Sequence, residues 1–141
     1  MKKTFTIIFL IGTLTSFSQS EEIFGEYFHD LGNEEHRIER KLNLNQDGTF
    51  TFHSYSNSKA GIPQIVHKYG KGTWSVDGKV VSFYTDNEKD IDEKHTLNFS
   101  DSRARFITKL SHNKTNKLIK TRLQFFESKI FWIERMVIFK I

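Results

Sequence analysis

The sequence predicts an all-β protein: an antiparallel up-and-down β-barrel of about eight to ten strands. Apolar and polar residues alternate along most of the chain beyond residue 22, which is the pattern of half-buried strands. Short polar segments rich in glycine, asparagine and aspartate separate these strands, and no amphipathic helix of three turns or more is apparent there. A meander of this kind hides its edges by closing on itself, and a two-sheet sandwich is the alternative architecture.

The first twenty residues have the character of a secretory leader. Two lysines precede an apolar run at residues 5–14, and Ser18 and Ser20 are the small residues expected before a cleavage site. The run is shorter than the ~20 residues that a membrane span needs, so we expect none in the mature chain. The sequence therefore predicts a signal peptide at 1–20 and one domain at 21–141, located in the periplasm or outside the cell.

Composition excludes several classes of protein. The chain has no cysteine, which rules out disulfides, thiolate metal ligands, a cysteine nucleophile and lipid attachment through an N-terminal cysteine. Fourteen phenylalanines, two tryptophans and four tyrosines can supply the core instead. Removing the two leader lysines lowers the formal charge from +4 to +2, and the charges of both signs are interspersed. Nucleic-acid binding is therefore not expected.

The first half of the domain begins with two strands and a tight hairpin. We expect strands at residues 23–28 and 36–45, with a polar loop at 29–35 between them. Leu44 should pair with Phe50 and Leu42 with Phe52, because these large apolar groups must share one face. That register leaves a three-residue loop at 46–48, in which glycine takes the positive φ of a type I turn with a bulge.

A second hairpin follows a turn at residues 56–63. Taking Asp77-Gly78 as a two-residue type I′ turn pairs Val76 with Lys79, Trp74 with Val81 and Gly72 with Phe83. The inner face then carries Trp74, Val76, Val81 and Phe83. The strand before this turn, residues 64–76, contains Gly70-Lys71-Gly72, which predicts a bulge or a bend.

The second half repeats the same alternation. Residues 86–93 and 112–116 are expected to be loops, and strands are expected at residues 95–99, 104–110, 119–125 and 130–141. The last of these is apolar on both faces, which predicts a strand covered by the core and also by a neighbouring segment or a second copy.

Several turn and core residues resemble those of small bacterial lipocalin-like (calycin-type) secreted domains: Gly25, Tyr27, Leu42, Leu44, Asp47, Gly48, Phe50, Phe52, Gly72, Thr73, Trp74, Gly78, Val81 and Phe83. The resemblance implies a small barrel whose interior holds an apolar ligand. Two departures limit it. The glycine-any-tryptophan motif of better-known lipocalins is replaced by Gly25-Glu26-Tyr27, and the cysteines of the envelope-stress lipoproteins are missing, so metal or redox sensing is not implied.

The candidate ligand site combines the expected interior with two polar residues. The predicted lining is Phe50, Phe52, Trp74, Val81, Phe83, Leu97, Phe99 and Phe106. Arg40 is in phase with Ile38 and Leu42, so its guanidinium would bind the carboxylate of an amphipathic ligand; alternatively it reaches water at the barrel mouth. His95 is in phase with Leu97, which places it either in the interior or at its rim.

Metal and catalytic sites are less well supported. His53 and His67 would face each other if the intervening turn is symmetric about Ala60, but no third ligand is evident, so a surface pair is favoured over a zinc or copper site. The acidic loop Asp86, Asp90 and Asp92 lacks the glycine and glutamate spacing of a calcium-binding loop. No hydrolase motif is present.

These observations predict an exported, non-enzymatic barrel that binds a small apolar or amphipathic molecule, without cofactor or metal. The alternative is a structural or protein-interaction domain with a filled core, which would bind a partner or a second copy through residues 130–141. A third and weaker hypothesis is a small enzyme with its site in the barrel mouth. A cavity of about 300 Å³ or more reached by Arg40 would favour the ligand carrier.

Overall fold

The structure, a computed structural model, describes residues 22–108 and 120–141, and within these ranges the chain is helical at Glu22 and Ile23 alone. Nine strands make up the rest of the regular structure of this part: β1 (Gly25–Gly32), β2 (His36–Leu44), β3 (Thr49–Ser58), β4 (Ile65–Asp77), β5 (Val80–Tyr84), β6 (His95–Leu97), β7 (Ser102–Ile107), β8 (Arg122–Glu127) and β9 (Val137–Lys140). No helix in the described ranges is long and apolar enough to cross a membrane.

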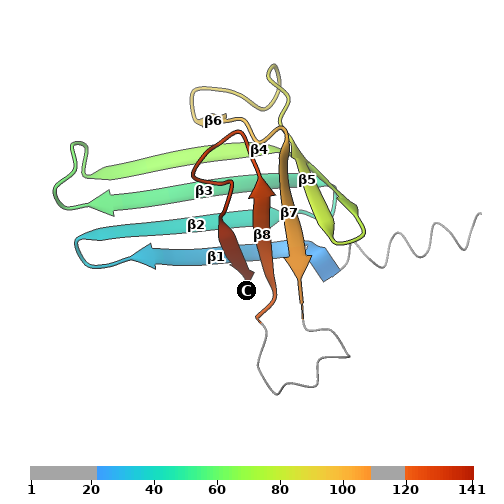
Figure 1. The fold of residues 1–141 in the computed structure, drawn as a ribbon. Helices are drawn as coiled ribbons and strands as arrows, with labels where there is room; N and C mark the ends of the chain where they lie inside the picture. The colour runs from blue at the N-terminus through green and yellow to red at the C-terminus, as the bar shows by residue number, and fades with distance from the viewer. Residues whose placement is uncertain (1–21, 109–119) are drawn as a thin grey trace, which may run out of the picture.

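Eight of these strands close into an antiparallel barrel (Figure 1). Each barrel strand pairs with the next one along the chain, and β9 pairs back with β1. The last seam is short, with two residue pairs, Tyr27–Lys140 and Phe28–Phe139. The predicted all-β barrel is therefore confirmed over the two-sheet sandwich, and the architecture is consistent with the lipocalin-like fold that the sequence resembles.

The remaining strand, β6, lies outside the ring and runs parallel to β4. It pairs at Tyr69 and Gly70, beyond the point where β5 leaves β4. The expected strand at 95–99 is thus shorter than predicted and is not part of the antiparallel meander. Its place follows from the free edge that β4 offers once β5 has diverged.

The first tight hairpin has the predicted register. Leu44 pairs with Phe50 and Leu42 with Phe52. The Gly48 amide donates to the Asn45 carbonyl at 3.1 Å, and Gly48 adopts a φ of +88°. Large apolar groups and turn chemistry demanded the same register, which is why local sequence was sufficient here.

The predicted turn of the second hairpin is wrong by one residue. Asp77 pairs with Val80, so the two-residue loop is Gly78-Lys79, and Trp74 faces Phe83 rather than Val81. The shift moves the pairing by two positions, which preserves the face of every side chain. The predicted inner face is therefore correct although the partners are not.

Polar residues 29–32 form strand rather than the expected loop. They continue β1 and pair with β2 as far as Gly32–Arg37, so the turn lies at residues 33–35. This part of the strand has little apolar alternation because it extends beyond the packed core. Its ladder hydrogen bonds, rather than burial, make it a strand.

The predicted long strand at 130–141 is correct only for Val137–Lys140. Residues 131–135 form consecutive turns, and the strand begins at Val137. Ile133 and Met136 are buried in the core, and Ile130 and Trp132 pack against it. Apolar residues on both faces therefore mark a connection folded over one end of the core, not a strand covered twice.

The long strands β1 to β4 pass through two different regions (Figure 1). In the closed end, they complete the barrel with β5 and β7 to β9. Outside the closed end, the same strands form a four-stranded sheet, called here the projecting sheet. It consists of residues 29–32 of β1, 36–40 of β2, 54–58 of β3 and 65–68 of β4.

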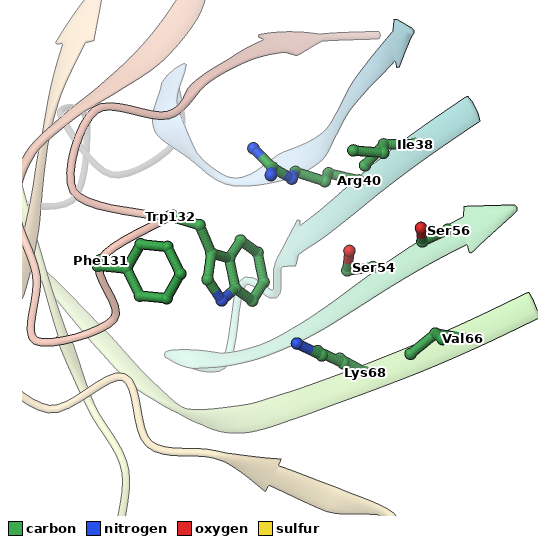
Figure 2. Close-up of a pocket in the computed structure, with 8 residues that line it drawn as sticks. All are labelled: Ile38, Arg40, Ser54, Ser56, Val66, Lys68, Phe131 and Trp132. Atoms are coloured by element: carbon green, nitrogen blue, oxygen red, sulfur yellow. The ribbon is translucent and has the colours of Figure 1, made fainter. Parts of the chain in front are cut away.

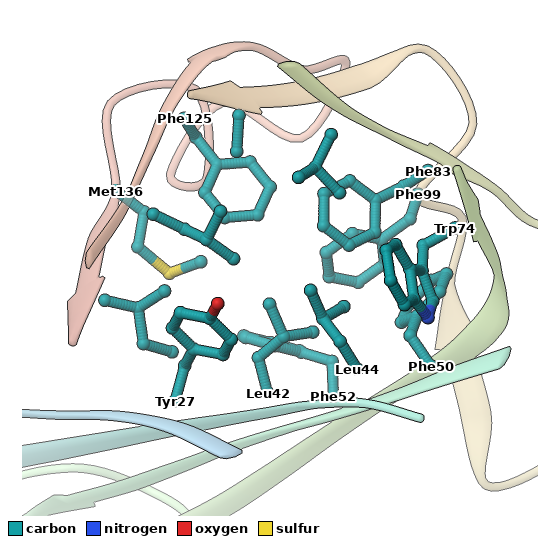
Figure 3. Packing of buried hydrophobic residues seen from close by; sticks show 14 of the residues in the cluster. Tyr27, Leu42, Leu44, Phe50, Phe52, Trp74, Phe83, Phe99, Phe125 and Met136 are labelled. Carbon is teal, nitrogen blue, oxygen red and sulfur yellow. The ribbon is translucent and has the colours of Figure 1, made fainter. Parts of the chain in front are cut away.

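The closed end is filled by aromatic and aliphatic side chains (Figure 3). The rings of Phe50 and Phe83 meet edge to face with centroids 5.1 Å apart, and the ring of Phe99 lies 5.2 Å from that of Phe50. Phe99 also covers the bare backbone of Gly70, where a Cβ atom would lie 2.7 Å from the ring. Where a bulge or a bend was predicted, the pairing of β3 with β4 continues without a shift, and aromatic rings pack against the glycine backbone instead.

Candidate functional site

The aromatic residues predicted to line a ligand cavity lie in the packed core of the closed end: Phe50, Phe52, Trp74, Phe83, Phe99 and Phe106. Each is at most 9% exposed. The ring of Phe99 contacts those of Phe50, Phe52 and Phe83, with centroids 5.1 to 6.0 Å apart. These side chains fill the interior, so space for a ligand is expected only where the core ends.

An open cleft of about 320 Å³ lies on the inner face of the projecting sheet (Figure 2). Its floor consists of two rows of residues paired across β2, β3 and β4: Arg40, Ser54 and Lys68 beside the core, then Ile38, Ser56 and Val66 further out. Phe131 and Trp132, from the connection between β8 and β9, form the wall of the cleft.

Strand periodicity places Arg40 in this cleft. Residues 38, 40, 42 and 44 share one face of β2, and Leu42 and Leu44 are buried in the core. Arg40 occupies the next inward position beyond them, as the sequence predicted. It lies where the barrel opens. The two predicted alternatives, a position that faces a ligand site and a position at the barrel mouth, therefore coincide.

The guanidinium group of Arg40 is poorly satisfied in this position. Its carbon atom lies 4.9 Å from the ring centroid of Trp132, a cation–π distance. Its Nε atom is buried and has no hydrogen-bond acceptor among the described residues. Burial lowers the pKa of Arg40, because the charged form loses solvation.

A second cation, Lys68, converges on the same indole ring. Its Nζ atom lies 5.5 Å from the Trp132 centroid, and Figure 2 shows it pointing to the ring from the side opposite Arg40. Within the described part of the chain, neither cation forms an ion pair with a carboxylate. By contrast, Arg37, on the other face of β2, pairs with Asp30 and Glu39. The cleft therefore carries uncompensated positive charge.

This cleft is assigned from geometry. Comparison with protein-family models, curated proteins and solved structures gives no significant match for the chain. The likeness to lipocalin-like domains accordingly rests on the turn and core residues and on the closed barrel itself.

A second lobe of about 400 Å³ adjoins the first across Phe131 and Trp132. Arg40 lines both lobes, and Glu134 and Arg135 give the second one charges of both signs. The Nδ1 atom of His29 lies 2.6 Å from the Val137 carbonyl oxygen, which fixes the imidazole in the wall of this lobe. The mixed charge makes this lobe less selective for an anion than the first.

On the outer face, His53 and His67 do meet, but not directly across the ladder. His53 pairs with Tyr69, because the turn is centred on Gly61 rather than Ala60. The two imidazoles lie diagonally, with Nε2 of His53 2.8 Å from Nδ1 of His67 and ring planes 7° apart. Burial and the neighbouring imidazole lower the pKa of His53. Among the described residues no three His, Asp or Glu side chains form a metal-binding group.

His95 was predicted to lie in the interior or at its rim, and the structure places it on the outer face. A register shift between Tyr69 and Gly70 aligns His95 with the outward Tyr69, while Leu97 is aligned with the inward Gly70. The Nδ1 atom of His95 lies 3.0 Å from an oxygen of Asp92, and its ring stands 6.1 Å from Tyr69. His95 lines a small outer pocket of about 230 Å³ instead of the interior.

The acidic loop uses its carboxylates to hold its own turns. Asp86 accepts from the Glu88 amide, and Asp90 accepts from the Asp86 amide, each at 2.9 Å. Asp92 accepts from the amides of His95 and Lys94, and these bonds contribute to a pKa lowered to about 2. These oxygens are already engaged, so a turn-forming role accounts for the acidic residues.

Lys68, Phe131 and Trp132 were not predicted as site residues. Lys68 shares the inner parity of Gly70 and Trp74 on β4, which was a usable signal. For Phe131 and Trp132 no local signal existed, because they reach the cleft through a connection that the pattern predicted to be strand. Their position depends on contacts between segments about 65 to 90 residues apart in the chain, which periodicity does not encode.

Proposed function

We propose that this protein is a non-enzymatic binding barrel that holds a small apolar or amphipathic molecule in the cleft of the projecting sheet. The observation that carries the proposal is a cleft of about 320 Å³ with aromatic, aliphatic and cationic groups side by side. Small-molecule sites combine an apolar lining with a few convergent polar groups in this way, and their volumes begin at about 300 Å³.

The closed end supports this function from outside the site. Rigid packing around Phe52 positions the floor of the cleft, since Phe52 precedes Ser54 on the inner face of β3 and its ring lies 6.0 Å from that of Trp132. The wall and the floor are therefore both anchored to the core. A site built on such a scaffold needs little ordering when the ligand binds.

Native mass spectrometry tests the proposal. Protein purified from its source, or exposed to a lipid extract, should carry a small-molecule adduct. Ser56→Trp places an indole in the cleft and should abolish the adduct, whereas Thr51→Trp, on the exposed outer face of the same strand, should retain it. Absence of an adduct from the native protein and from Thr51→Trp alike would contradict the proposal.

The cellular location is part of the same proposal. A leader at 1–20, which lies outside the described residues, would export the domain to the periplasm or the cell exterior. N-terminal sequencing of the protein recovered from a cell-envelope fraction should start at or near residue 21. Recovery of the uncut chain from the cytoplasm would refute export without affecting the binding proposal.

A protein-interaction domain remains the second candidate because the barrel interior is filled. Phe131 is 85% exposed at the rim of the cleft, and Ile141 is 69% exposed. A partner or a second copy bound through the 130–141 segment would bury these side chains. Light scattering separates the two candidates, since concentration-dependent dimerisation abolished by Phe131→Ser would favour interaction over ligand transport.

A further inference from the structure

We propose that the molecule held in the cleft is a compact amphipathic anion, whose headgroup lies over Ser54 and contacts Arg40 and Lys68 beside the indole of Trp132. The inference rests on the proposed function, because it names the chemical class of the ligand for that site. It predicts discrimination by charge in addition to binding of an apolar group.

The charge of the cleft supports an anion. Arg40 and Lys68 approach the Trp132 ring to 4.9 and 5.5 Å, and neither has a carboxylate partner within the described residues. Two like charges held over one ring repel each other, and burial has removed part of the hydration of Arg40. An anion that contacts both groups would reduce the repulsion and accept hydrogen bonds from them.

The order of residues along the floor places the headgroup. Arg40, Ser54 and Lys68 lie in one row across three strands, so a guanidinium, a hydroxyl and an ammonium converge on the end of the cleft nearest the core. Ser54 is 8% exposed and stands between the two cations. A planar carboxylate suits this row, because a guanidinium can donate two parallel hydrogen bonds to it.

The apolar part of the ligand should be short. Ile38 and Val66 form the next row outwards, and beyond them the sheet ends at its turns. Phe131 covers the side of the cleft. A volume of about 320 Å³ is near the lower limit for small-molecule sites, which favours a medium-length acyl chain or a single aryl group over a long lipid.

Isothermal titration calorimetry with matched eight-carbon probes tests the inference: octanoate, mono-octyl phosphate, 1-octanol and octyltrimethylammonium. At low salt, octanoate should bind at least about tenfold more tightly than octanol, as expected for one charge-assisted hydrogen bond. The cationic probe should bind more weakly than octanol. Comparing the affinities for octyl phosphate and octanoate shows whether the site prefers a tetrahedral or a planar headgroup.

Variants locate the effect. Arg40→Met and Lys68→Met keep the apolar stems but remove the charges, and each should bring octanoate affinity close to that of octanol. Arg37→Met is the control, because Arg37 lies on the other face of the same strand in ion pairs with Asp30 and Glu39. Trp132→Phe should remove the change in tryptophan fluorescence that accompanies binding. Thermal melts verify that each variant is folded.

The outcomes separate the two proposals. If octanol and octanoate bind equally in the cleft, the anion inference fails and the binding function stands. If no probe binds and the native protein carries no adduct, the proposed function itself fails. If Arg37→Met weakens octanoate as much as Arg40→Met does, the charge effect is not local to the cleft and the inference is wrong.

Discussion

The closed end and the projecting sheet share strands β1 to β4, yet their inner faces differ completely. The last row of the closed end is Leu42, Phe52 and Gly70, which the ring of Phe99 covers. The next row, two residues further along each strand, is Arg40, Ser54 and Lys68. The strand pattern continues without a break, but the chemistry changes from an aromatic core to an open cationic cleft.

Under the proposed function, the two regions divide stability and binding between them. The closed end stabilises the fold through ring packing, and the projecting sheet needs few contacts of its own because its strands are already held at one end. Residues in the cleft are therefore free to be selected for binding. Such residues are expected to be neutral or unfavourable for stability.

The largest effect should come from removing a core ring. Phe99→Ala deletes a fully buried side chain in contact with three other aromatic rings, which should lower the free energy of unfolding by about 3–5 kcal/mol. Ser56→Ala, on the floor of the cleft, should change it by less than about 0.5 kcal/mol. Urea denaturation measures the free energy of unfolding of both variants. Similar losses at the two sites would contradict the idea that the closed end stabilises the fold and the cleft does not.

The next largest loss of stability is expected from Gly70→Ala. Its new Cβ would lie 2.7 Å from the Phe99 ring, so about 1–3 kcal/mol of stability should be lost to overpacking. Phe99→Leu in the same chain should make the Gly70→Ala change less costly, because a smaller side chain can move away. A double-mutant cycle measures this coupling, and strict additivity would show that the ring does not press on the glycine.

The effect of Arg40→Met on the free energy of unfolding should have the opposite sign. Replacing an under-satisfied guanidinium by an apolar side chain of similar length should raise the free energy of unfolding by about 1 kcal/mol or leave it unchanged. Arg37→Met, which breaks two exposed ion pairs, is the reference substitution. A clear loss of stability in Arg40→Met would mean that this residue supports the fold rather than the site.

The smallest effect concerns pH. The pKa of His53 is lowered in the folded state by burial and by the neighbouring His67, and nearby Lys94 and Lys41 act in the same direction while Glu39 opposes them. The unfolded chain therefore binds this proton more readily, and stability should fall as the pH drops below about 6.5. Thermal melts between pH 7.5 and 5 should show a shallower decline for His53→Gln than for His36→Gln, an exposed control.

Much of the barrel was predictable because the alternation of apolar and polar residues (their parity) and the turn residues favoured the same strand pairing. At Leu42–Phe52 both pointed to one register, and it was correct. At Asp77-Gly78 parity could not separate two registers that differ by two positions, so the face was right and the partners were wrong. Residues 29–32 show the limit of alternation, since a strand outside the core need not alternate.

The candidate site was predictable in part. Arg40 was found because it interrupts an apolar phase, and the structure places it in the cleft. Its aromatic partner Trp132 was assigned to a strand, because an apolar connection folded over a core has the same composition as a buried strand. The distance in sequence between these two residues is what local reasoning could not bridge.

The short seam between β1 and β9 has a consequence for the lifetime of the folded state. Its ladder has two residue pairs, against nine between β2 and β3, and one further backbone bond joins the Ile141 amide to the Glu26 carbonyl. If β9 detaches, β1 and β8 both lose a neighbour in one event, and two strand edges become available to other molecules. Amide hydrogens of β9 should therefore exchange early, and this opening is the expected first step of any aggregation.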